Sequence, residues 1–168
     1  MTRATHLIRR FFGSLRPRPV GEADVMWVRS VLTTPELRVW ETLGPADRAE
    51  SVVVAHRAAR ALGPDADPVW IAAALLHDAG KSEADLGTLG RAGATVVGIV
   101  MSKGRARHLP NRIGTYLAHD DIGAELLREA GARSEVSAWA GAHHRAEQWP
   151  ATGLPAPVAA ALAEADGI

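Results

Sequence analysis

The residues of clearest chemical interest in this 168-residue chain are a histidine and an aspartate side by side, His77 and Asp78, in LLHDAGK (75–81). They follow the apolar run VWIAAALL, and the spacing predicts a buried helix over residues 67–80. Burying an unpaired carboxylate is costly, and the C-terminal end of a helix gives an acid no help from the backbone dipole. A bound divalent cation would resolve this cost, so the pair indicates a metal site.

Three further segments place histidines or an acid at helix ends or beside small residues. AHDDIGAELL puts His119 just before an expected helix, AGAHHRAE puts His143 and His144 after a run of small residues, and ALAEAD ends an apolar helix in Asp166. Small neighbours leave room for something bulky. The repetition of this arrangement predicts one shared metal centre, and nitrogen and oxygen ligands without sulfur suit manganese, iron, zinc, cobalt or nickel.

Helical spacing dominates the elements that would position these residues. The fold class is therefore predicted to be all-α, a single bundle of about seven or eight helices that is not a coiled coil. Residues 1–21 are predicted to be a basic arm and linker, and 22–168 the helical domain. The expected helices cover residues 23–32, 33–44, 46–63, 67–80, 91–104, 120–131, 135–149 and 158–166.

Composition excludes several classes of site. The chain has no cysteine, which rules out disulfides, thiolate nucleophiles and cysteine-ligated zinc or iron–sulfur centres. The net charge of +0 gives no sign of nucleic acid, and no apolar run approaches the roughly 20 residues of a membrane span. We expect a cytoplasmic protein. The first 19 residues carry five arginines and no acid, and LIRRFF within them is expected to be a solvated arm or a weak contact with an anionic surface.

The ordered set of residues resembles the HD-domain metal-dependent phosphohydrolases. LLHDAGK matches the signature of that family, and HDDIGAELL and AHH resemble the later segments of its paired-histidine subset, which includes the HD-GYP type. The resemblance covers roughly residues 47–168 and implies an HD-type helical bundle. It also implies hydrolysis of a phosphomonoester or phosphodiester, expected to be a nucleotide, by a metal-activated water. The partner is thus a small phosphorylated substrate.

Two departures from the family pattern matter. The family opens with a histidine where this chain has Glu50, in ESVVVA (50–55). His56 lies six residues further on, about 600° around a helix and so about 240° from Glu50, and we expect it to face elsewhere. Glutamate can ligate a divalent ion, so Glu50 is expected in the site; in a decayed site it would be a solvated acid. GLP (153–155) matches the GYP loop only in part.

The resemblance implies two divalent ions. One ion would be held by Glu50, His77, Asp78 and Asp166. The other would be held by His119, His143 and His144, with Asp78 as the bridge between the two ions. Two ions carry +4 and three carboxylates −3, which leaves about +1 to attract phosphate. Asp78 and Lys81 are the expected catalytic residues. Lys81 is assigned to a phosphate oxygen as a point charge, Arg145 is also assigned to substrate, and Arg91 is a further candidate.

Two other functions stay open from the sequence. Because Glu50 replaces the expected histidine, a degenerate HD domain could bind metal or nucleotide as a sensor or interaction module. A helical scaffold without metal is the third class. The substrate is not specified, since loops such as 82–92 and 102–112 would set it, and the oligomeric state is equally open.

Overall fold

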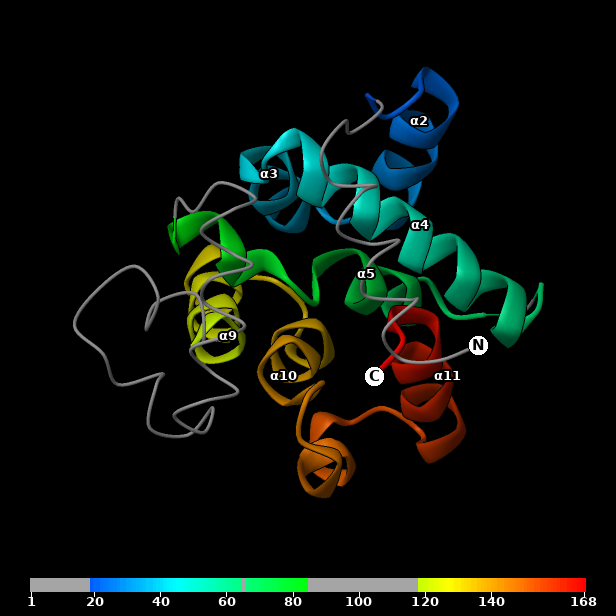
Figure 1. The fold of residues 1–168 in the computed structure, drawn as a ribbon, viewed down its shortest axis with the longest axis vertical. Helices are drawn as coiled ribbons and strands as arrows, with labels where there is room; N and C mark the ends of the chain where they lie inside the picture. Colours follow the sequence, from blue (N-terminus) through cyan, green and yellow to red (C-terminus); the bar gives the residue numbers. More distant parts are fainter. Residues whose placement is uncertain (1–18, 65, 85–117) are drawn as a thin grey trace, which may run out of the picture.

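In the computed structural model, the structure describes residues 19–64, 66–84 and 118–168 (Figure 1). These residues form seven α-helices and two 3-10 helices and contain no strand, which confirms the predicted all-α bundle. None of these helices is long and apolar enough to cross a bilayer. The elements are α2 (Glu22–Val31), α3 (Thr34–Thr42), α4 (Pro45–Leu62), α5 (Pro68–Leu76), η1 (Ala79–Ala84), α9 (His119–Ala130), α10 (Ser134–Ala142), η2 (Ala146–Thr152) and α11 (Ala156–Asp166).

Two predictions fall outside this part of the chain. The basic segment LIRRFF belongs to residues 1–18, and the expected helix over 91–104, with Arg91, belongs to residues 85–117. Both remain predictions.

Local sequence signals explain the boundaries of α3 and α4. The backbone N–H of Thr33 donates to Glu36 Oε2 at 2.9 Å, which satisfies a helix-start donor in the manner of a capping box. Helix α4 begins at Pro45, whose fixed φ suits the first turn, and ends at Leu62; the capping Gly63 has a φ of 85°, which glycine adopts without strain.

Two predicted helices end earlier than expected, and in each the residue that follows the helix is a histidine of the candidate site. Helix α5 ends at Leu76 rather than Gly80, and α10 ends at Ala142 rather than Trp149, each followed by a 3-10 helix. The expected bounds 67–80 and 135–149 were therefore wrong at their C-terminal ends. The reason is local, because each capping histidine donates its ring Nδ1–H to the carbonyl three residues before it and so satisfies a helix-end acceptor.

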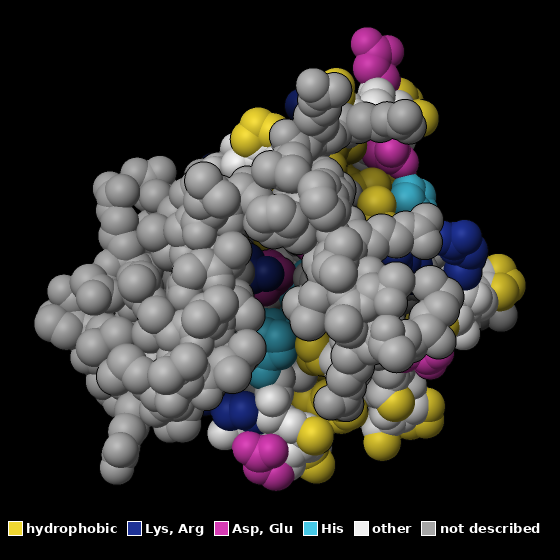
Figure 2. All heavy atoms as spheres, in the orientation of Figure 1, with side chains coloured by type: hydrophobic (Ala, Val, Ile, Leu, Met, Phe, Trp, Pro, Cys, Tyr) yellow, Lys and Arg dark blue, Asp and Glu magenta, His cyan; other side chains and the backbone are white. Residues whose placement is uncertain are grey.

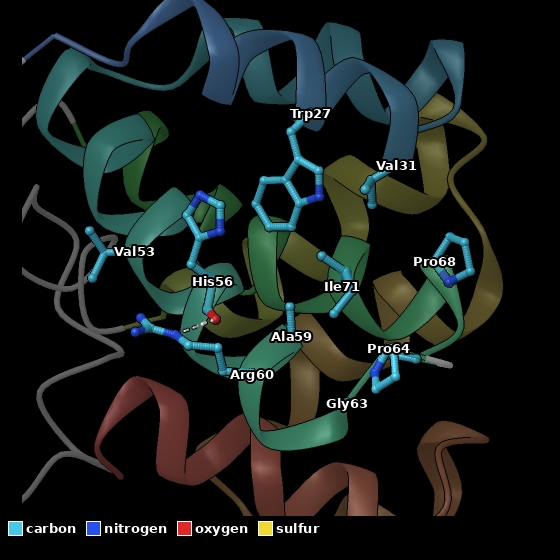
Figure 3. A pocket seen from close by; sticks show the side chains of 11 residues that line it. Trp27, Val31, Val53, His56, Ala59, Arg60, Gly63, Pro64, Pro68 and Ile71 are labelled. Carbon is cyan, nitrogen blue, oxygen red and sulfur yellow. Dashed lines mark hydrogen bonds between the residues drawn. The ribbon is translucent and has the colours of Figure 1, made fainter.

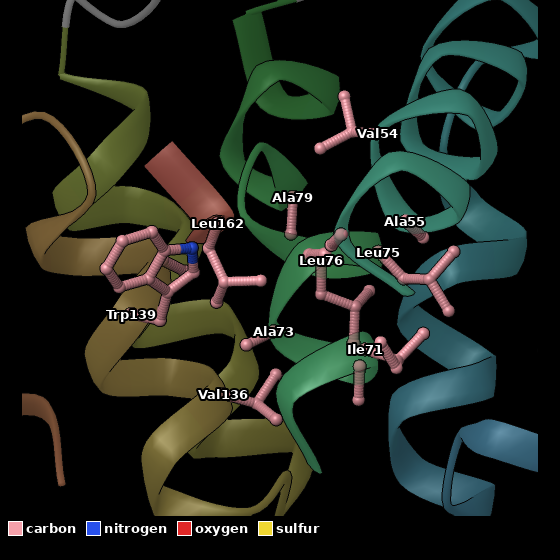
Figure 4. Close-up of a cluster of buried hydrophobic side chains, with 14 of the residues drawn as sticks. Val54, Ala55, Ile71, Ala73, Leu75, Leu76, Ala79, Val136, Trp139 and Leu162 are labelled. Atoms are coloured by element: carbon pink, nitrogen blue, oxygen red, sulfur yellow. The ribbon is translucent and has the colours of Figure 1, made fainter. Parts of the chain in front are cut away.

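Helix α5 lies at the centre of the bundle, packed between α4, α10 and α11 (Figure 1). Leu75 and Leu76 of α5 are buried with Val136 and Trp139 of α10 and Leu162 of α11 (Figure 4). Burying a side chain of this size stabilises the fold by about 1.5–3 kcal/mol. The core therefore holds the C-terminal end of α5, where His77 and Asp78 follow.

Candidate metal centre

Asp78 lies at the meeting point of three histidines from three different segments. Its Oδ1 is 3.2 Å from His119 Nε2, at the start of α9, and 3.8 Å from His143 Nε2, at the end of α10. Its Oδ2 is 3.2 Å from His77 Nε2. The side chains of these histidines are between 1% and 5% exposed. The structure therefore brings the imidazoles of positions 77, 119 and 143 together around one carboxylate.

Two of these histidines have fixed ring orientations. His77 Nδ1–H donates to Ala74 O at 2.8 Å, and His143 Nδ1–H donates to Ala140 O at 2.9 Å. A backbone hydrogen bond of this kind leaves Nε2 as the atom available for a metal. Both Nε2 atoms and Asp78 Oδ1 are buried and, although the ring nitrogens lie 3.2–3.8 Å from the Asp78 oxygens, none of the three atoms makes a well-formed hydrogen bond within the described residues. Because such atoms are costly unless a ligand satisfies them, this donor set fits a divalent cation.

A second grouping joins His119 and His143 to His144, which is the most exposed of the three. Each offers one ring nitrogen, and these nitrogens lie within 4.8 Å of one another. Two nitrogens bound to one ion at about 2.1 Å are at most about 4.2 Å apart. The trio is thus close to the spacing at which three nitrogens share an ion.

The other predicted ligands lie on the opposite side of Asp78. Asp166, the last residue of α11, places Oδ1 3.4 Å from His77 Nε2. Glu50, in α4, lines a small pocket together with His77 and Asp78. The substituted family position therefore lies beside the aspartate, and its role as a ligand remains a prediction.

His56 faces away from this cluster, as expected. Its Nε2 is 2.8 Å from Asp24 Oδ1 of α2, and its ring stacks on Trp27 with centroids 4.1 Å apart and planes 5° apart. Figure 3 shows His56 and Trp27 lining a separate groove between α2 and α4.

Sequence reasoning missed one acid of this region. Asp47 is 7% exposed and lines the same small pocket as Glu50, His77 and Asp78. It stands three residues before Glu50, close to one helical turn, and that spacing is the signal that would have shown a shared face.

The electrostatics of the cluster favour a cation beside Asp78. Burial alone would lower the pKa of His77, but Asp78 and Asp166 outweigh it and raise that pKa to about 10. Burial alone would raise the pKa of Asp78, but Lys81 and His77 hold it well below its ordinary value. Burial and then the neighbouring histidines lower the pKa of His143, which keeps it in the neutral form that binds metal.

The two predicted substrate cations have different surroundings. Lys81 Nζ pairs with Asp78 Oδ2, so an ammonium group lies inside the cluster. Arg145 Nη2 instead donates to Asp121 Oδ1 at 2.7 Å and lies 3.7 Å from Asp120 Oδ2. Near the centre of the face in Figure 2, basic, acidic and histidine side chains come to the surface together.

The domain is all-helical in its described residues, and the ends of its helices bring histidines and aspartates together in its interior. The chain belongs to the HD-domain family, because the family model described as "HD domain" matches residues 50–168. That range contains every ligand position inferred from the sequence. Searches of curated proteins and of solved structures found no match.

Proposed function

We propose that this chain hydrolyses a phosphomonoester or a phosphodiester, with nucleotides as the substrate class, using divalent ions held by the Asp78 cluster. The observation that carries the proposal is the convergence of the buried Nε2 atoms of His77, His119 and His143 on the carboxylate of Asp78, at 3.2–3.8 Å. Bound divalent ions would supply Lewis-acid stabilisation of the phosphoryl group and activation of water. The ligands would be Glu50, His77, Asp78 and Asp166 on one side, and His119, His143 and His144 on the other.

Asp78 is the proposed bridge because its two oxygens face different histidines. Oδ2 lies by His77, on the side of Asp166 and Glu50, whereas Oδ1 lies by His119 and His143. A carboxylate with this disposition can serve two ligand sets at once.

Lys81 is the proposed phosphate contact of the protein itself. Its ammonium group is already within the cluster through Asp78, and its side chain is 12% exposed. Three donors on a flexible stem allow it to orient an anionic phosphate oxygen while Asp78 serves as a ligand. Nucleotides are proposed from the family resemblance, and the charge of the cluster supports a phosphorylated substrate in general.

The direct test measures metal content and turnover together. The purified chain would be analysed for bound metal and assayed with manganese on p-nitrophenyl phosphate, bis-p-nitrophenyl phosphate and a nucleotide panel. We expect bound metal and turnover, with both lost in Asp78→Ala. His56→Ala is the matched control, because this histidine pairs with Asp24 and Trp27 away from the cluster. Equal turnover in wild type and Asp78→Ala would refute the proposal.

A second candidate function rests on Glu50. A glutamate in place of the family's first histidine adds a negative charge to the pocket that it shares with His77 and Asp78. A degenerate domain of this kind would bind metal or nucleotide as a sensor or interaction module. Bound metal with no turnover on any compound of the panel would favour this module over the enzyme.

A further inference from the structure

An ion pair joins the two helix ends that carry the paired histidines and His119. Arg145 directly follows His144, and Asp121 comes two residues after His119. Arg145 Nη2 donates to Asp121 Oδ1 at 2.7 Å and also to Gly141 O, the carbonyl one turn back in α10. A single guanidinium therefore contacts both helix ends.

Helices α9 and α10 pack closely beside this ion pair, so a small shift of one helix would change the contact. A Cβ added at Gly141 would lie 3.1 Å from the Cβ of Ala124, so the two helices approach closely just beside the ion pair. The acid lies in the first turn of α9 and the arginine follows the last turn of α10, so each charge is also favoured by the dipole of its own helix.

The hydrogen bonds described for His143 join it to residues of its own segment. Its Nδ1–H donates to Ala140 O, and Trp149 Nε1–H donates to its carbonyl at 3.2 Å. Such bonds set the direction of the ring, but they do not set the separation between His143 on α10 and His119 on α9. The Asp121–Arg145 pair, in contrast, joins the start of α9 to the end of α10, beside these histidines.

We propose that Arg145 is a positioning residue, and that the Asp121–Arg145 pair sets the spacing at which His119, His143 and His144 share one divalent ion. The inference rests on the proposed function, since it needs a metal centre there. It assigns Arg145 a role different from the direct substrate contact expected from the sequence. The side chain of Asp121 is 56% exposed, so the pair contributes little to folding and its effect should appear in metal binding.

The chemistry of arginine supplies a conservative variant. One guanidinium nitrogen, Nη2, donates to both Asp121 Oδ1 and Gly141 O, and the planar group holds that nitrogen in a fixed direction. Arg145→Lys keeps the positive charge and removes the planar group. It also leaves Asp121 in the first turn of α9, so the start of that helix is undisturbed.

The test titrates cobalt(II) into the full-length wild type, Asp121→Asn, Arg145→Lys and the double variant, followed by visible absorption. We expect about tenfold weaker binding in each single variant, the size typical for partners that orient metal ligands, with an altered absorption band. The double variant should be no weaker than either single one, because both changes break the same pair. Glu125→Gln is the matched control: Glu125 pairs with Arg128 on the same helix at 59% exposure and should bind as wild type does.

Three outcomes would overturn the inference. Asp121→Asn with wild-type cobalt affinity would show that the pair does not set the spacing. Arg145→Lys with unchanged cobalt affinity and a raised KM would assign the arginine to the substrate. Wild type that binds no cobalt would refute the proposed metal centre and this inference together, whereas the first two results leave the proposed function intact.

Discussion

Gly80 lies directly against the backbone of His119. A Cβ built on Gly80 would overlap the carbonyl oxygen of His119 and would stand 2.6 Å from the backbone nitrogen of Gly123. The segment that follows Asp78 therefore meets the first turn of α9 through backbone atoms, with no side chain between them. This contact brings Asp78 Oδ1 within 3.2 Å of His119 Nε2.

Gly80→Ala should damage both the fold and the metal centre. A methyl group in contact with backbone cannot be relieved by rotating a side chain, so the cost should exceed the usual range of about 1–3 kcal/mol for overpacking. Urea unfolding would measure the loss of stability, and cobalt titration the loss of metal binding.

Two other glycines provide graded comparisons for this prediction. A Cβ at Gly123 would lie 2.8 Å from the backbone nitrogen of Gly80, whereas one at Gly141 would meet only the side-chain Cβ of Ala124 at 3.1 Å. Gly141→Ala should therefore cost least and Gly80→Ala most. The opposite order would show that the backbone contact does not limit the approach of the two segments.

Metal binding should raise the melting temperature, and the rise should depend on His143. A ligand at 100 times its Kd stabilises the folded state by about 2.7 kcal/mol, because only the folded chain presents the site. Manganese or cobalt should therefore raise Tm in wild type, and His143→Ala should lose that rise.

His56→Ala is the control for this measurement. His56 is a histidine of the same chain that pairs with Asp24 instead of facing the cluster. The His56→Ala variant should have a changed Tm without metal, because it loses the contacts of His56, and should keep the rise in Tm on adding metal. An equal rise in wild type and His143→Ala would exclude His143 as a ligand.

Helix boundaries were predictable where the signal is local and conventional. The capping pattern of Thr33 and Glu36 and the glycine at position 63 mark the ends that the structure shows. The ends at His77 and His143 were missed because a histidine counts as an ordinary helical residue until its ring is seen to bond the carbonyl three residues back. The same hydrogen bonds from Nδ1 turn Nε2 of each histidine toward the cluster. The missed helix ends are therefore part of the candidate site.

The members of the candidate site were largely predictable, but several of their neighbours were not. The ordered motifs selected the residues around Asp78 because each motif is readable within a few positions. Asp47 was missed although its three-residue spacing from Glu50 within one helix points to a shared face. The partner of Arg145 was missed because it depends on how helices pack. Arg145 meets Asp121 across 24 positions of sequence, and no periodicity within one helix reports that distance.

A buried ion pair between α3 and the start of α10 should govern stability in acid. Glu36 is fully buried and accepts Arg133 Nε–H at 2.9 Å and Nη2–H at 2.7 Å. Burial alone would raise the pKa of Glu36, but the hydrogen bonds from Arg133 and Thr33 hold it below 4.5. A lowered folded-state pKa means that this stabilisation is present above about pH 4.5 and is lost as the pH falls further.

Glu36→Gln should therefore lower the free energy of unfolding by about 3 kcal/mol at pH 7, because one partner of a buried pair is removed. Below pH 4.5 the difference from wild type should shrink. Urea unfolding at pH 7 and at pH 3.5 measures both. Glu41→Gln is the control, because Glu41 lies 3.7 Å from Arg29 in an exposed pair and should change stability by less than about 1 kcal/mol. A Glu36→Gln deficit that is the same at both pH values would contradict the assignment.

Substitutions at Glu50 test whether the site still binds metal at this position or has lost that ligand. If its carboxylate holds an ion beside His77 and Asp78, Glu50→Ala should bind less metal per chain, and Glu50→His should retain metal because it restores the family's usual ligand. Because imidazole is neutral and softer than carboxylate, Glu50→His should also favour zinc or cobalt over manganese. Elemental analysis after dialysis against each metal measures both effects.

An exposed acid on another helix provides the comparison that makes the Glu50 result specific. Glu164, on α11, is exposed, and Glu164→Ala should leave the metal content unchanged. Metal content that is identical in wild type, Glu50→Ala and Glu50→His would mean that position 50 is no ligand. In that case the ion would be held by the histidines and aspartates alone, and the substitution would mark a site that has lost its first metal position.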